Sequence, residues 1–134
     1  MRVVYVDSDV VISSLLSQKG AAFLLLENKS ADFVISEISE LEILEVGRRL
    51  NISKESVKRA ISKFRKIVSP DTKQFEKYVF DLDDAFIIAG AVKAKAKFLI
   101  TYNTRHYLID KIKNNFGVII MTPALFLQYL RSQQ

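Results

Sequence analysis

Residues 3–12, Val-Val-Tyr-Val-Asp-Ser-Asp-Val-Val-Ile, set a short apolar run directly before an acidic turn and a second apolar run. The first run, residues 3–6, is β-branched and aromatic, and it predicts a fully buried strand. Apolar residues then recur at helical spacing over residues 8–17, with Ser8 or Asp9 as the expected N-cap. A buried strand that passes through an acidic turn into a helix is typical of an α/β protein.

The same alternation of strand and helix continues along the chain. Further strands are expected at residues 32–35, 66–68, 98–101 and 118–121. Further helices are expected at residues 21–26, 37–50, 54–64, 72–77, 85–96, within 104–115 and from Pro123 onward. This order predicts a three-layer α/β/α sandwich with a mostly parallel central sheet of four to five strands, joined by right-handed crossovers.

Length and composition narrow the class of protein. We predict a single domain over residues 1–134, because compact domains most often have about 100–150 residues. Cysteine is absent, which excludes disulfides and thiolate chemistry and agrees with a reducing cytoplasm. An acid at position 7 and the lack of an apolar run of about 20 residues predict neither a signal peptide nor a membrane span.

The net charge of +5 favours partners with a phosphate backbone. Basic residues crowd the helical region between residues 48 and 77. The candidates for nucleic-acid binding are Arg48, Arg49, Lys54 and Lys58. A solvated, lysine-rich surface explains the same residues equally well, so the charge alone does not decide the function.

Acidic and polar residues follow the predicted strands, where open parallel sheets place their ligand sites. They are Asp7, Asp9, Ser36, Glu37, Glu40, Glu42, Asp81, Asp83, Asp84, Thr101 and Asn103. Each has a structural explanation as a helix cap, a turn residue or part of a solvated face. Their convergence at one edge favours a site, because clustered carboxylates repel one another unless a cation neutralises them.

The residue types at this edge predict which metal is bound. Oxygen ligands, no cysteine and a single histidine favour Mg²⁺ or Mn²⁺ over zinc. Such ions activate water and stabilise charge on phosphate oxygens, so no side-chain nucleophile is needed. The single histidine, His106, is expected to be a surface or packing residue.

Four segments together resemble the PIN-domain family. They are residues 4–12 (VYVDSDVVI), residues 33–36 (FVIS) followed six positions later by Glu42, residues 81–91 (DLDDAFIIAGA) and residues 98–103 (FLITYN). The resemblance covers nearly the whole chain in both order and spacing. It implies a PIN-like α/β sandwich and a divalent-metal-dependent ribonuclease.

The resemblance also implies roles for individual residues. Asp7, Glu42 and Asp84 match the metal-binding carboxylates, and Thr101 and Asn103 complete the pocket. Asn103 stands where many relatives carry a further aspartate and is a candidate metal ligand with the three carboxylates. Asp9, Asp81 and Glu40 are secondary candidates, and Glu42 is favoured over Glu40 because Leu41 and Leu44 mark the core side of the helix.

Partners follow from the same resemblance. Many bacterial and archaeal PIN domains are VapC-like toxins that an antitoxin protein holds inactive, and homodimers are common in the family. RNA, an antitoxin and a second copy of the chain are therefore the expected partners, in the cytoplasm and away from membranes. The apolar helix at residues 21–26 is either a dimer face or part of the core.

Two other functions stay open at the level of the sequence. Asp7-Ser8-Asp9, Ser36 and Asp83-Asp84 also look like the motifs of haloacid-dehalogenase-type phosphatases, which would form an aspartyl-phosphate on Asp7. Alternatively, Asn103 weakens the second metal and leaves a PIN-like module that binds RNA or a protein partner without cleaving it.

Overall fold

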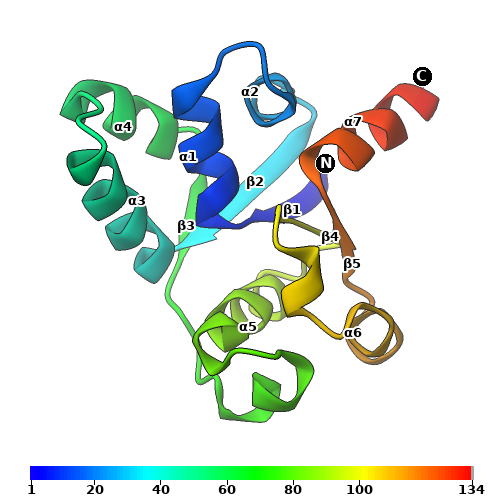
Figure 1. The fold of residues 1–134 in the computed structure, drawn as a ribbon. Coiled ribbons are helices and arrows are strands. Elements are labelled where there is room, and N and C mark those ends of the chain that lie inside the picture. The colour runs from blue at the N-terminus through cyan, green and yellow to red at the C-terminus, as the bar shows by residue number, and fades with distance from the viewer. Residues whose placement is uncertain (134) are drawn as a thin grey trace.

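The computed structural model describes residues 1–133, in which helices cover both faces of a central sheet (Figure 1). The strands are β1 Arg2–Val6, β2 Ala31–Ser36, β3 Arg65–Ile67, β4 Phe98–Ile100 and β5 Ile119–Met121. Their order in the sheet is β3-β2-β1-β4-β5, and every pair is parallel. The predicted α/β sandwich is confirmed, with five strands and a sheet that is parallel throughout.

The helices separate into groups around the sheet. They are α1 Ser8–Leu16, α2 Ala21–Leu26, α3 Glu37–Arg49, α4 Lys54–Ile61, α5 Ala85–Lys93, α6 Ile109–Phe116 and α7 Pro123–Ser132, with 3-10 turns η1 Lys73–Tyr78, η2 Leu82–Asp84 and η3 Thr104–His106. Figure 1 shows α1, α2 and α7 on one face, α5 and α6 on the other, and α3 with α4 beyond the end of β2. Within residues 1–133 no helix is both long and apolar enough to cross a bilayer.

Successive residues of each strand enter different hydrophobic clusters. In β1, Val4 and Val6 pack under α1 and α2, whereas Tyr5 packs against α5 on the opposite face. The same alternation holds for Phe98 and Leu99 in β4. Because both faces are covered, residues 3–6 of β1 and all of β4 are apolar, which is the signature of a buried parallel strand.

Side-chain caps explain where several helices begin. The hydroxyls of Ser36 and Ser53 accept from the backbone N–H of Ser39 and Ser56, both at 3.1 Å, as the sequence predicts. The expected cap of α1 is wrong. Asp7 occupies that N-cap position, and its side chain makes no capping hydrogen bond, so its carboxylate is available for other contacts.

The structure corrects the predicted end of one helix and decides between two explanations for another. The helix expected at residues 85–96 ends at Lys93, because Lys95 adopts a left-handed backbone conformation with φ 57°. In α2, Ala22, Leu25 and Leu26 are buried in the core. This burial favours the core explanation for residues 21–26 over the dimer face.

The contact between Tyr5 and α5 gives the first prediction. A Cβ on Gly90 would overlap the Tyr5 hydroxyl and lie 2.6 Å from Tyr5 Cζ, deep in the core. We expect Gly90→Ala to lower the free energy of unfolding by about 1–3 kcal/mol, the usual effect of overpacking. Gly20→Ala is the matched control, since its nearest contact lies at 3.6 Å. Urea unfolding that ranks the two variants in the opposite order would contradict this packing.

Candidate active site

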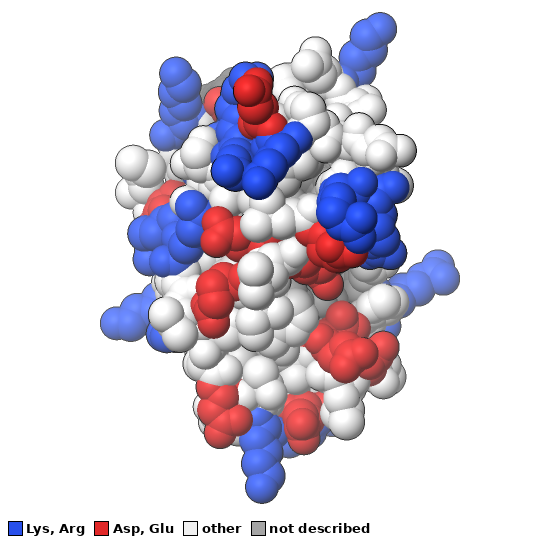
Figure 2. Space-filling view, turned by 90° about the vertical axis from the view of Figure 1, so that its left-hand side faces the viewer, with Lys and Arg blue, Asp and Glu red and all other residues white. Residues whose placement is uncertain are grey.

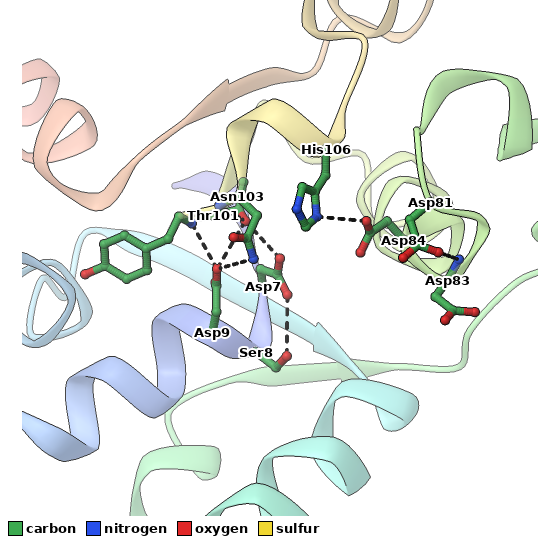
Figure 3. A network of polar contacts seen from close by, with 10 residues as sticks. Asp7, Ser8, Asp9, Asp81, Asp83, Asp84, Thr101, Asn103 and His106 are labelled. Atoms are coloured by element: carbon green, nitrogen blue, oxygen red, sulfur yellow. Dashed lines mark hydrogen bonds and ion pairs between the residues drawn. The ribbon is translucent and has the colours of Figure 1, made fainter.

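Asp7 lies at the carboxyl end of β1 and is 8% exposed (Figure 3). Thr101 Oγ1 donates to Asp7 Oδ2 at 2.9 Å, and Ser8 Oγ lies 3.4 Å from Asp7 Oδ1. Burial raises the pKa of Asp7 above its ordinary value, and the charges of Glu42 and Asp84 raise it further. The ionised form of Asp7 is therefore destabilised by its surroundings and would be stabilised by a cation.

Asp9, in the first turn of α1, holds the residues that follow β4 (Figure 3). Its Oδ2 accepts from the backbone N–H of Tyr102 and from Asn103 Nδ2, each at 3.1 Å. Its Oδ1 is buried and has no hydrogen-bond partner within residues 1–133. Burial, with the charge of Asp7 as a second cause, raises the pKa of Asp9 to about 7. Asp9 thus positions Asn103 and contributes a second partly compensated carboxyl group.

Glu42 and Glu40 lie on α3 but have different partners. Ser8 Oγ donates to Glu42 Oε1, which places the Glu42 carboxylate next to the hydroxyl that also approaches Asp7. Glu40 Oε2 lies 3.6 Å from Lys66 Nζ in a partly exposed ion pair. Residues two positions apart on a helix point about 200° away from each other, so only one of the glutamates can face Asp7. In this structure it is Glu42.

Asp84, at the end of η2, is bonded to the histidine of η3 (Figure 3). His106 Nδ1 lies 3.0 Å from Asp84 Oδ2. Burial raises the pKa of Asp84, and His106 opposes this shift. Asp81 Oδ1 accepts from the backbone N–H of Asp83 at 3.0 Å, so Asp81 caps the turn that carries Asp84.

The donors at this edge fit a divalent cation by their chemistry. The acids nearest one another are Asp7, Asp9 and Glu42, and none of them is paired with a Lys or Arg within residues 1–133. Carboxylate oxygens are the ligands that Mg²⁺ and Mn²⁺ prefer. Across residues 1–133 no three acidic or histidine side chains are already gathered around one point. Since Glu42 is bonded to Ser8 and Asp84 to His106, each of these carboxylates would have to exchange that partner to share an ion with Asp7.

Comparison with known proteins gives the family. A family model for the PIN domain matches residues 2–105, which span all the segments that carry the carboxylates. The chain belongs to the PIN domain family. This membership favours the nuclease interpretation over the phosphatase alternative. No curated protein matches the sequence.

Solved structures show the same PIN-domain fold. A toxin–antitoxin complex from Klebsiella pneumoniae contains a chain with 24% identity and a TM-score of 0.67, covering 90% of this chain and 97% of that one. PAE2754 from Pyrobaculum aerophilum has 15% identity and a TM-score of 0.66, covering 98% and 96%. VapBC2 from Rickettsia felis, bound to a promoter DNA fragment, has 17% identity and a TM-score of 0.57, covering 90% and 98%.

The predicted basic residues lie on α3 and α4 of the PIN domain. Arg48 donates to both carboxylate oxygens of Glu45, at 2.7 and 3.2 Å, and Arg49 Nε lies 3.8 Å from the same residue. Lys54 shares a groove with Arg48, and Lys58 lines a separate one. Figure 2 shows acidic side chains across the middle of one face and basic side chains above and to both sides of them. Nucleic-acid binding by these four residues stays a prediction.

Sequence reasoning missed Ser8 and His106 as site residues. Ser8 was expected only as a cap, yet its hydroxyl lies between Asp7 and Glu42. Its position between two acids in the Asp7-Ser8-Asp9 turn was the available signal. His106 is predicted as a surface or packing residue, and it is exposed, but nothing local in the sequence shows that it also contacts Asp84, 22 positions away.

Asp9→Asn gives a prediction on pH dependence. The pKa of Asp9 rises from 3.8 to about 7 on folding, so the folded state binds the proton more tightly than the unfolded chain. The stability that protonated Asp9 contributes is therefore fully present below pH 4 and is lost as the pH rises through about 7. In EDTA at pH 8 we expect Asp9→Asn to raise the melting temperature by about 4 °C or more, with a smaller rise at pH 5.

The control for this prediction is Asp110→Asn, which removes an exposed acid from α6. It changes the net charge by the same amount without touching the carboxylate cluster. An Asp9→Asn protein that melts lower than the parent at pH 8 would show that the hydrogen bonds to Tyr102 and Asn103 outweigh the cost of burying the charge.

Proposed function

We propose that this PIN domain is a divalent-metal-dependent endoribonuclease that hydrolyses phosphodiester bonds in RNA. The observation that carries the proposal is that the buried Asp7 and the exposed Glu42 meet at one serine hydroxyl, and neither is paired with a basic side chain within residues 1–133. These carboxylate oxygens suit a divalent cation, and such a cation promotes phosphoryl chemistry.

The proposed roles divide between ligands and positioning residues. Asp7, Glu42 and Asp84 hold Mg²⁺ or Mn²⁺, with Asn103 at the edge of the same pocket. When bound, such an ion lowers the pKa of a water molecule and stabilises charge on the phosphate oxygens. Thr101 orients Asp7 through a 2.9 Å hydrogen bond.

Asp9 orients Asn103 through a second hydrogen bond, at 3.1 Å. Hydrogen bonds to metal ligands of this kind keep the ligands in place, and losing one typically costs 10- to 100-fold in affinity or activity.

We further propose that the chain is the toxin of a toxin–antitoxin pair in the cytoplasm. The support is the shared fold with a chain of the Klebsiella pneumoniae toxin–antitoxin complex and with a chain of VapBC2 from Rickettsia felis. An antitoxin protein is then the expected inhibitor, and a homodimer is the expected free form. Co-expression with the product of a neighbouring reading frame, followed by co-purification, tests the pairing.

The first experiment measures metal-dependent cleavage. The purified protein is incubated with a single-stranded RNA of mixed sequence in Mn²⁺, in Mg²⁺ and in EDTA. We expect cleavage in the metal reactions and none in EDTA. The Asp7→Asn variant, purified in the same way, controls for contaminating nuclease.

Absence of cleavage in every reaction would contradict the nuclease. RNA binding without cleavage would then support the alternative of a binding module. Two points favour that alternative as the second candidate: Asn103 is uncharged where the family resemblance implies an aspartate in many relatives, and no three-ligand group is already assembled within residues 1–133. Asn103→Asp would test it by restoring a charge next to Asp9.

A further inference from the structure

A groove beside the carboxylates is lined by an exposed aromatic ring and two basic side chains. It lies along η3 and the start of α6, and it has a volume of about 330 Å³. Phe80 forms part of the lining and is 72% exposed. Arg105 and Lys111 line the same groove, and neither makes an ion pair within residues 1–133. Asp110 is the acid among the lining residues.

The exposure of Phe80 is not explained by folding. Its neighbours Tyr78 and Val79 are buried, at 7% and 9% exposure, so the chain at this point has core positions for apolar side chains. The backbone is also fixed, since Phe80 N–H donates to the His106 carbonyl at 2.9 Å and Val79 pairs with Tyr107 in an antiparallel bridge. Phe80 therefore presents an exposed apolar ring at the groove, on a backbone that these two contacts hold in place.

The same backbone contacts place the groove next to the proposed catalytic residues. The Phe80 N–H bond ends on His106, whose side chain contacts Asp84. Phe80 also directly precedes Asp81, the cap of the turn that ends at Asp84. Four residues span at most about 14 Å, so the backbone positions of Phe80 and Asp84 lie within that distance of each other.

We propose that this groove binds an unpaired nucleotide of single-stranded RNA next to the cleavage site. The base stacks on Phe80, and Arg105 and Lys111 contact the backbone phosphates that flank it. This inference rests on the proposed function and adds a substrate-binding site to it. Flat aromatic faces and Arg guanidinium groups are the partners that single-stranded RNA uses, because only unpaired bases expose their faces.

Charge complementarity favours a nucleotide over an apolar protein helix. A helix would cover Phe80 but would leave the two cations without a partner, whereas a nucleotide supplies a flat apolar face and a phosphate together. The groove therefore predicts a preference for single-stranded RNA over a duplex of the same sequence, in which the bases are already stacked and paired.

The test measures binding without cleavage. A fluorescein-labelled 12-nucleotide single-stranded RNA is titrated with protein in EDTA and followed by anisotropy. We expect Phe80→Ala to weaken binding about 5- to 150-fold, the usual effect of losing one stacked base, and Arg105→Gln to weaken it less. Phe80→Tyr should bind like the parent, because it keeps the ring. The controls are Leu125→Ala and Arg131→Gln, which remove exposed side chains from α7.

A spectroscopic test shows the stacking directly. The chain contains no tryptophan, so Phe80→Trp introduces a single indole. We expect single-stranded RNA to quench its fluorescence with the same dissociation constant that anisotropy gives, and an equal amount of duplex RNA to quench it much less. Unchanged affinity in Phe80→Ala, or an indole that RNA does not quench, would overturn the inference.

Failure of this inference is distinguishable from failure of the proposed function. If the parent cleaves RNA but Phe80→Ala binds and cleaves equally well, the nuclease stands and the groove is not its binding site. If the parent binds RNA through Phe80 but cleaves nothing in Mn²⁺ or Mg²⁺, the RNA-binding role of the groove is supported and the nuclease function is contradicted.

Discussion

Asp7→Asn is expected to lower the rate of metal-dependent RNA cleavage roughly 1000-fold, the kinetic equivalent of losing several kcal/mol of stabilisation of the transition state. Asp7 is the most buried of the site carboxylates, at 8% exposure, and it contacts both Thr101 and the Ser8 hydroxyl that binds Glu42. An amide has almost the same shape but lacks the negative charge that holds a cation. Initial rates with a labelled single-stranded RNA in Mn²⁺ measure the effect.

Asp7→Asn lowers activity, but it should not lower the stability of the metal-free protein. Burial raises the pKa of Asp7, so the folded protein disfavours the ionised form. Without metal at pH 8, Asp7→Asn should therefore melt at the same temperature as the parent or above it. Millimolar Mn²⁺ should raise the melting temperature of the parent but not that of the variant, because only a state that binds the ion gains from it.

The combination of these results separates a catalytic role from a structural one. Lost cleavage together with a lower melting temperature in EDTA would mean that Asp7 supports the fold, and its assignment as a metal ligand would be wrong. Glu76→Gln, which removes an exposed acid from η1 outside the groove at Phe80, is the control and should change neither the cleavage rate nor the melting temperature appreciably.

The fold follows from local patterns in the sequence. Residues 3–6 are apolar without a polar alternation, and the structure buries Val4, Tyr5 and Val6 completely, on alternating faces of the sheet. Ser36 caps its helix because its hydroxyl can replace a missing intrahelical partner within one turn. Such effects reach only a few residues along the chain, so they are visible without knowledge of the tertiary structure.

The ends of strands and the exposure of individual side chains are harder to predict, because they depend on contacts between distant segments. The third strand was expected at residues 66–68 but is Arg65–Ile67, and Val68 is 68% exposed. Leu41 was expected on the core side of its helix and is 66% exposed, while Leu44 does pack against the core. The helix α3 packs on α1 and α4 beyond the sheet, and the sequence does not show how it is rotated there.

The arrangement of the site depends on contacts between distant segments. Parallel strands bring Asp7 and Thr101 to one edge, which strand order alone predicts. The bond between Asp84 and His106 requires that η2 and η3 meet, and this depends on the antiparallel bridge between Val79 and Tyr107. A single bridge of this kind has no periodic pattern in the sequence.

The second large effect on cleavage is expected at α3, where Glu42 and Glu40 should differ. Glu42→Gln is expected to reduce cleavage about 100-fold or more, whereas Glu40→Gln should stay within about twofold of the parent. Glu42 shares the Ser8 hydroxyl with Asp7, and its charge contributes to the raised pKa of Asp7. Glu40 instead pairs with Lys66 at 3.6 Å in a partly exposed position, where an ion pair is worth little.

Both substitutions remove one charge from the same helix, so helix propensity and net charge are matched between them. Removing the charge of Glu42 should also let the pKa of Asp7 fall toward its ordinary value, because a like charge next to it is gone. Single-turnover rates and the Mn²⁺ dependence of melting together decide the outcome. If Glu40→Gln lost both cleavage and the Mn²⁺ effect while Glu42→Gln kept them, Glu40 would be the ligand, and α3 would have to rotate by about half a turn when the metal binds.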